Sequence, residues 1–143
     1  AGELVRQILA DIIFPLWGNG LIWWDIRDAN WVFDLVRKKI CVIDSDSLAA
    51  YATEIMSTSD VWTRREKGRL TALSRLRQTC LRIFEKQASA TRSAIQRTHQ
   101  ELWNCEVEPL LRQLGRDNPS DETVRVVIGR YLDGMSACCR RKE

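Results

Sequence analysis

Hydrophobic spacing is the feature that most constrains how this chain can fold. In four stretches the apolar residues recur every three or four positions, which places their side chains on one face of a helix. These stretches are residues 3–17, 64–86, 88–114 and 122–137. Glycine and asparagine at 18–20 end the first stretch, and Ser120 can cap the last. The sequence therefore predicts a mainly α fold.

Short β-prone segments interrupt the helical pattern near the start of the chain. Residues 31–33 and 39–43 are separated by a charged turn at 34–38, so we expect them to pair as a β-hairpin. A third β-prone segment is residues 21–24, and residues 48–56 are expected to be weakly helical. The expected order is thus one helix, a small β-hairpin region and a helical bundle.

Length and composition limit the classes of protein to consider. The chain has 143 residues, of which 45% are hydrophobic, enough for one compact domain or a part of a larger one. No run of 18 apolar residues exists, so neither a membrane span nor a membrane partner is expected. The five cysteines form no C-x-x-C pair, and their odd number is typical of reduced thiols in a cytoplasmic protein.

Charge is spread unevenly along the chain. The first 50 residues hold seven acidic and five basic residues, and the rest holds 12 acidic and 17 basic ones. The arginine-rich residues 64–82 could contact nucleic-acid phosphates. Acidic residues interleave them and the apolar stripe is well formed, so a solvated helix face is the preferred interpretation, with no nucleic-acid partner. His99 and Cys105 are six residues apart, on different sides of a helix, which argues against a metal site there.

The residues that indicate chemistry lie around the predicted hairpin. Asp25 and Asn30 share the short loop before its first strand, and Asp44 and Asp46 follow its second strand. Phosphoryl transfer needs a carboxylate near the acceptor hydroxyl and oxygen ligands for magnesium beside the phosphates. The alternative is that these residues only form turns and caps, and for Asp46 a helix N-cap before residues 48–56 is the preferred role.

With the spacing Asp25-x-x-x-x-Asn30 and the segment Ile43-Asp44-Ser45-Asp46-Ser47, the chain resembles the C-lobe of an atypical bacterial protein-kinase-like fold. Aminoglycoside-phosphotransferase-like enzymes are more distant relatives in this comparison. Residues 3–17 correspond to the helix before the catalytic loop. The resemblance divides the chain into residues 1–47, the catalytic-loop half of the lobe, and residues 48–143, its helical remainder.

The resemblance implies a role for each of these side chains. Asp25 would orient or deprotonate the acceptor hydroxyl, and Arg27 would neutralise the transferred phosphoryl group. Asn30 and Asp44 would bind the cofactors ATP and Mg²⁺, with Asp46 as a further metal ligand. Trp23 and Trp24 stand where the family has histidine and arginine, so the usual arginine link to a phosphorylated activation loop is absent.

The chain lacks the parts that would complete such an enzyme. A kinase also needs a glycine-rich loop and a strand lysine, and no G-x-G-x-x-G sequence occurs here. We therefore expect the N-lobe to come from the rest of the same polypeptide or from a partner chain, and residues 1–143 alone to be inactive. The expected reaction is transfer of the γ-phosphoryl group of ATP to a hydroxyl acceptor, with protein Ser/Thr preferred over a small molecule. The alternative function is a catalytically inactive, pseudokinase-like helical module that binds a protein partner.

Overall fold

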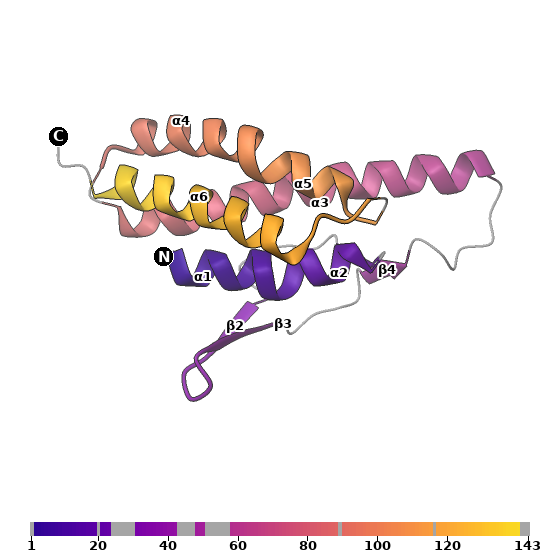
Figure 1. Cartoon of the computed structure of the whole chain (residues 1–143), viewed down its shortest axis with the longest axis horizontal. Coiled ribbons are helices and arrows are strands. Elements are labelled where there is room, and N and C mark those ends of the chain that lie inside the picture. Colours follow the sequence, from indigo (N-terminus) through magenta and orange to yellow (C-terminus); the bar gives the residue numbers. More distant parts are fainter. Residues whose placement is uncertain are drawn as a thin grey trace.

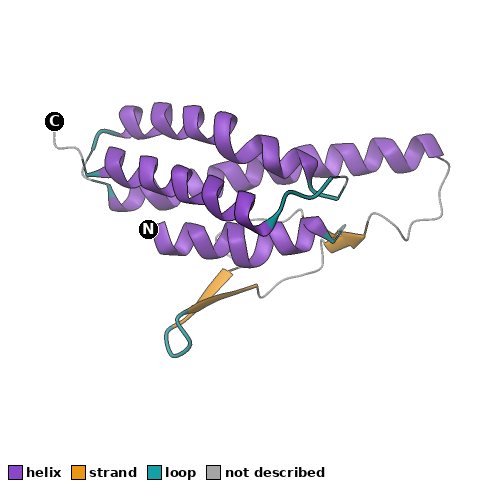
Figure 2. Cartoon of the chain, viewed as in Figure 1, coloured by secondary structure: helices purple, strands orange, loops and turns teal. Residues whose placement is uncertain are grey.

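Helices account for most of the structure, as the purple ribbons in Figure 2 show. The computed structural model describes residues 2–19, 21–23, 31–42, 48–50, 58–88, 90–115 and 117–140. Its helical segments are α1 (Gly2–Arg6), η1 (Gln7–Ile13), α2 (Phe14–Gly18), α3 (Thr58–Gln87), α4 (Arg92–Leu102), η3 (Trp103–Val107), α5 (Glu108–Gln113) and α6 (Asp121–Cys139). Its strands are β1 (Leu21–Trp23), β2 (Trp31–Asp34), β3 (Lys39–Val42) and β4 (Leu48–Ala50). The predicted mainly α class is confirmed.

The N-terminal rod is a run of α1, η1 and α2, in which η1 is a π-helical segment. A second π-helical segment, η3, joins α4 to α5. Each of these two segments ends two residues before a proline, Pro15 or Pro109. A proline has no N–H for the carbonyl four residues earlier, and its ring crowds that carbonyl. We attribute the wider π turns to this local conflict, which the helix absorbs without breaking.

The rod and the later helices pack into one bundle (Figure 1). The rod runs antiparallel to α6, because Gly2 lies near Ser136 and Gly18 lies near Asn118. Asn118 joins their ends: its Nδ2 donates to Gly18 O at 2.9 Å and its Oδ1 accepts from Gly115 N at 2.8 Å. The predicted cap is confirmed, since the Ser120 hydroxyl accepts from Thr123 N.

A single hydrophobic core runs through the bundle. Its largest fully buried side chains come from the rod, α3, α4, η3, α5 and α6: Trp17, Trp103, Tyr131, Phe84, Ile8, Leu9, Ile13, Leu76, Ile95 and Leu111. Helices α4 and α6 approach closely at Gly134, where a Cβ atom would lie 2.6 Å from Leu102 Cδ1. Gly134 therefore permits this crossing, because a larger residue would displace the Leu102 side chain.

Two antiparallel strand pairs accompany the bundle. Strands β2 and β3 form the predicted hairpin, with residues 35–38 as its turn. Strand β1 pairs with β4, so the expected helix over residues 48–56 is wrong at its start. The weak local helical preference of Leu48–Ala50 is overridden by pairing with a strand far back in the sequence. Residues 51–57 lie outside the described part of the chain.

Candidate functional site

Each of the two strand pairs holds two strand ends side by side, in two separate sheets. Trp23, the last residue of β1, is paired with Leu48, the first residue of β4. Trp31, the first residue of β2, is paired with Val42, the last residue of β3. Directly opposed residues in an antiparallel pair have Cα atoms about 4.5–5.5 Å apart. The start of connection 24–30 therefore adjoins the end of connection 43–47, at the Trp23–Leu48 pair. The end of connection 24–30 adjoins the start of connection 43–47, at the Trp31–Val42 pair.

All five side chains predicted to carry the chemistry belong to these two connections. Asp25, Arg27 and Asn30 are in the first, and Asp44 and Asp46 are in the second. Both connections lie outside the residues that the structure describes, so these assignments stay predictions. The N-cap role preferred for Asp46 is nevertheless weakened, because β4 is a strand and offers no helix start at residue 48.

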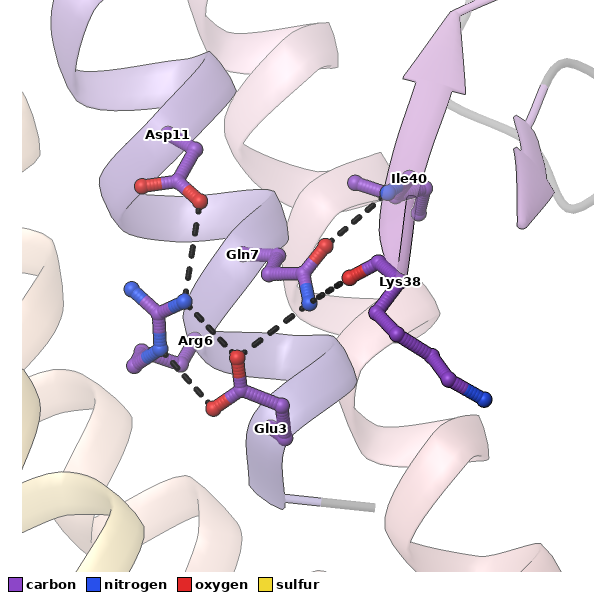
Figure 3. A network of polar contacts seen from close by, with 6 residues as sticks. All are labelled: Glu3, Arg6, Gln7, Asp11, Lys38 and Ile40. Carbon is purple, nitrogen blue, oxygen red and sulfur yellow. Dashed lines mark hydrogen bonds and ion pairs between the residues drawn. The ribbon is translucent and has the colours of Figure 1, made fainter. Parts of the chain in front are cut away.

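Gln7, on η1, fixes the hairpin to the rod, a role that the sequence did not reveal (Figure 3). Its Nε2 donates to Lys38 O at 3.1 Å, and its Oε1 accepts from Ile40 N at 2.9 Å. The Gln7 side chain is buried, and Nε2 also donates to Glu3 Oε1 at 3.2 Å. One amide group thus forms the same two bonds with β3 and its turn that a neighbouring strand would form.

Glu3 is in turn held by Arg6, which completes the network around Gln7 (Figure 3). Both guanidinium contacts are short, with Arg6 Nη2 2.7 Å and Arg6 Nε 2.9 Å from the Glu3 carboxylate oxygens. The hydrogen bonds from Arg6 and then Gln7 lower the pKa of Glu3 to about 2. Glu3 therefore stays charged at neutral pH and continues to accept from Gln7.

We expect Gln7→Ala to loosen the hairpin at its attachment. The substitution leaves Ile40 N–H and Lys38 C=O without their partner, which should lower the free energy of unfolding by about 1–2 kcal/mol. Hydrogen exchange at the Ile40 amide should accelerate by about 10-fold or more. Urea unfolding and exchange measured by NMR test both effects. The matched control is Gln100→Ala, on an exposed position of α4, and equal protection of Ile40 in both variants would contradict the role of Gln7.

A buried polar and aromatic cluster lies in the helical bundle, where α4, η3 and α6 meet. His99 Nε2 is 2.7 Å from the Tyr131 hydroxyl, and the His99 ring stacks on Trp103 with centroids 5.6 Å apart. All three side chains are fully buried. Burial, followed by the charge of Arg77, lowers the pKa of His99 to about 4. A neutral imidazole packed among aromatic rings has the properties of a core residue. Cys105, the other residue considered above for a metal site with His99, is exposed.

An open groove of about 680 Å³ runs between the rod and α6. Its walls are mainly apolar and include Phe14 and Ile128, and its floor passes Gly129, where no atom lies within 4 Å of an added Cβ. Arg6 and Arg125 line it as well, but each is paired with a glutamate of its own helical segment. Of the strand residues whose side chains the structure describes, none lines the groove.

Within the described residues, no group of three or more His, Cys, Asp or Glu side chains is arranged to hold a metal ion. None of the helices in that part of the chain is long and apolar enough to span a membrane. Comparisons of the chain with protein-family models, with curated proteins and with solved structures found no match.

Proposed function

We propose that this chain is the C-lobe portion of an atypical ATP-dependent kinase that transfers a γ-phosphoryl group to a hydroxyl acceptor, preferably protein Ser/Thr. The N-lobe would be supplied by the rest of the polypeptide or by a partner chain. One observation carries the proposal: the β1–β4 and β2–β3 pairs join the ends of the two connections that contain the motif residues.

Four of the motif residues lie only one or two positions from a paired strand end. Asn30 directly precedes Trp31, and Asp44 follows Val42 by two residues, so both are attached to the Trp31–Val42 pair. Asp25 follows Trp23 by two residues, and Asp46 precedes Leu48 by two, so both are attached to the Trp23–Leu48 pair. A chain extends by at most about 3.6 Å per residue. The Cα atoms of Asp25, Asn30, Asp44 and Asp46 therefore lie within about 7 Å of a paired strand end. Each pair thus keeps one residue of each connection near the other connection, which supports a common site.

The donor set fits the proposed cofactors. Asn30, Asp44 and Asp46 offer amide and carboxylate oxygens, the hard ligands that Mg²⁺ prefers, and no soft sulfur ligand occurs in either connection. When bound, Mg²⁺ with ATP supplies the activated phosphoryl group and neutralises its charge. Asp25 would accept the proton of the acceptor hydroxyl or orient that hydroxyl. Arg27 would contribute positive charge beside the transferred group.

The experiment that tests the proposal measures nucleotide binding by the complete two-lobed protein. A ligand present at 100 times its Kd stabilises the folded state by about 2.7 kcal/mol, so ATP with Mg²⁺ should raise Tm by about 5 °C or more. Asp44→Asn should remove most of the magnesium-dependent part of this shift, since it removes a charged ligand. The control Asp133→Asn makes the same chemical change at an exposed position of α6 and should keep the full shift.

Absence of any ATP-dependent shift in the unmodified complete protein would contradict the proposal. In that case a pseudokinase-like helical module that binds a protein partner becomes the better description. A full shift in Asp44→Asn would instead show that Asp44 does not hold the metal.

A further inference from the structure

The hairpin turn exposes aliphatic side chains to an unusual degree. At the tip of the β2–β3 hairpin, Leu35 is 73% and Val36 is 93% exposed, more than any other large hydrophobic residue that the structure describes. Short turns favour Gly, Asn, Asp, Pro and Ser, which suit their backbone geometry and their contact with water. The hairpin also projects away from the helical bundle (Figure 1). Two adjacent aliphatic side chains at such a point indicate a surface that meets a partner.

The tip is held in this position by hydrogen bonds. Asp34 Oδ1 accepts from Val36 N at 2.9 Å and from Arg37 N at 3.1 Å, which fixes the first half of the turn. Lys38 closes the turn with a positive φ of 56°. Gln7 then fixes the turn end of β3, at Lys38 and Ile40, to the rod, as described above. The aliphatic side chains are therefore presented outward by an ordered turn.

Three basic residues follow the two aliphatic residues in the sequence. Arg37, Lys38 and Lys39 follow them directly, and all three are exposed. Asp34 Oδ2 is 3.8 Å from Arg37 Nε, so the Asp34 carboxylate offsets the charge of Arg37. Among the described residues, no carboxylate lies within ion-pair distance of Lys38 or Lys39. In the described part of the chain, the two ammonium groups of the tip therefore have no ion-pair partner, although Asp34 is the cross-strand neighbour of Lys39. Such a tip suits a partner that is anionic and also accepts aliphatic groups.

We propose that residues 35–39 form a contact site for an anionic lipid membrane surface. Leu35 and Val36 enter the boundary between headgroups and acyl chains, while Lys38 and Lys39 meet the lipid phosphates and carboxylates. A membrane suits this tip better than a protein pocket does, since a stable protein interface buries about 800 Å² on each partner and two side chains offer far less. The expectation of no membrane partner rested on the missing membrane span, which a peripheral contact does not need.

Co-sedimentation with lipid vesicles tests the proposal. At low salt the chain should bind vesicles that contain 30% phosphatidylserine in phosphatidylcholine, and binding to pure phosphatidylcholine should be weaker by about 25-fold, since each basic residue near an anionic surface contributes about fivefold. Lys38→Gln with Lys39→Gln should lose the same factor of about 25. Leu35→Ser with Val36→Ser should lose about 10-fold or more on the same vesicles.

Matched controls separate the tip from general charge and hydrophobicity. Val126→Ser removes an exposed aliphatic side chain on α6, and Arg97→Gln removes an exposed charge on α4. Both should bind vesicles as the unmodified chain does. The proposal is overturned if the unmodified chain does not bind phosphatidylserine vesicles, as expected of a tip that docks on an acidic protein, or if the tip variants bind as well as the controls.

Discussion

In the two-lobed kinase proposed above, Asp25→Ala is expected to lower phosphotransfer by about 10²-fold or more. The reason is that Asp25 is proposed to orient the acceptor hydroxyl and take its proton, a contribution made in the transition state. We therefore expect kcat to fall while KM for ATP changes little. Transfer of labelled γ-phosphate to a hydroxyl acceptor, measured under steady-state conditions, gives both parameters.

The control for this experiment is Asp133→Ala, which removes an exposed carboxylate from α6 and should leave turnover unchanged. Equal thermal stability of the two variants would exclude unfolding as the cause of a lower rate. Phosphotransfer that continues at the original rate in Asp25→Ala would sink the catalytic assignment. Because nucleotide binding is measured separately with Asp44→Asn, a failed catalytic role can be told from a failed nucleotide site.

The second large effect is a loss of stability in mild acid, caused by the single histidine of the chain. The pKa of His99 is lowered from about 6.5 to about 4 in the folded protein, mainly by burial and then by Arg77. The unfolded chain therefore binds the proton more readily than the folded one. The stabilising contribution of neutral His99 is complete above pH 6.5 and is lost as the pH falls towards 4. The whole loss corresponds to about 3 kcal/mol.

The structure explains why the proton is unfavourable. A charged imidazolium has an N–H on both ring nitrogens, and among the described residues His99 Nδ1 has no hydrogen-bond partner. The charged ring thus has a buried N–H at Nδ1 without a partner as well as a buried charge. Urea unfolding followed by circular dichroism at several pH values from 7.5 to 4.5 measures the effect.

The matched variant for this titration is His99→Gln, which keeps a polar side chain but cannot change charge near neutral pH. Its stability at pH 7.5 should be lower, while its pH dependence between about 6.5 and 5 should be much flatter. Glu3 contributes little to the slope in this range, because its pKa is 4.5 in the unfolded chain and about 2 in the folded one, so its stabilising effect is lost only as the pH falls from 4.5 towards 2. A slope equal to that of the unmodified protein would show that other groups cause the acid sensitivity.

Residue spacing was sufficient to predict the helices, the hairpin and the Ser120 cap, since each depends on interactions within a few residues. The start of residues 48–56 was predicted wrongly because β4 exists only through its pairing with β1, which no local preference encodes. Nor did the pattern reveal Gln7, since a glutamine on an amphipathic helix looks the same whether it faces water or a neighbouring strand. The π turns near Pro15 and Pro109 follow from local geometry but leave the apolar period almost unchanged.

For the candidate site, the types of residue could be predicted from the sequence. The strand pairs show which ends of the two connections lie next to each other. Asp25 and Asp44 are 19 positions apart, and their spacing alone cannot show that they belong to neighbouring connections. That relation depends on the two registers, Trp23 opposite Leu48 and Trp31 opposite Val42. Register is set by tertiary packing and turn geometry, which a single sequence does not specify.

The strand pairs are also nested, with the whole β2–β3 hairpin inserted between the partners of the β1–β4 pair. Extra residues at the turn 35–38 would lengthen the projecting tip without altering either register. Turn tips are the positions where chains most readily accept insertions. The length and the side chains of the turn can therefore change during evolution, while the strand registers at the ends of the two motif connections stay the same.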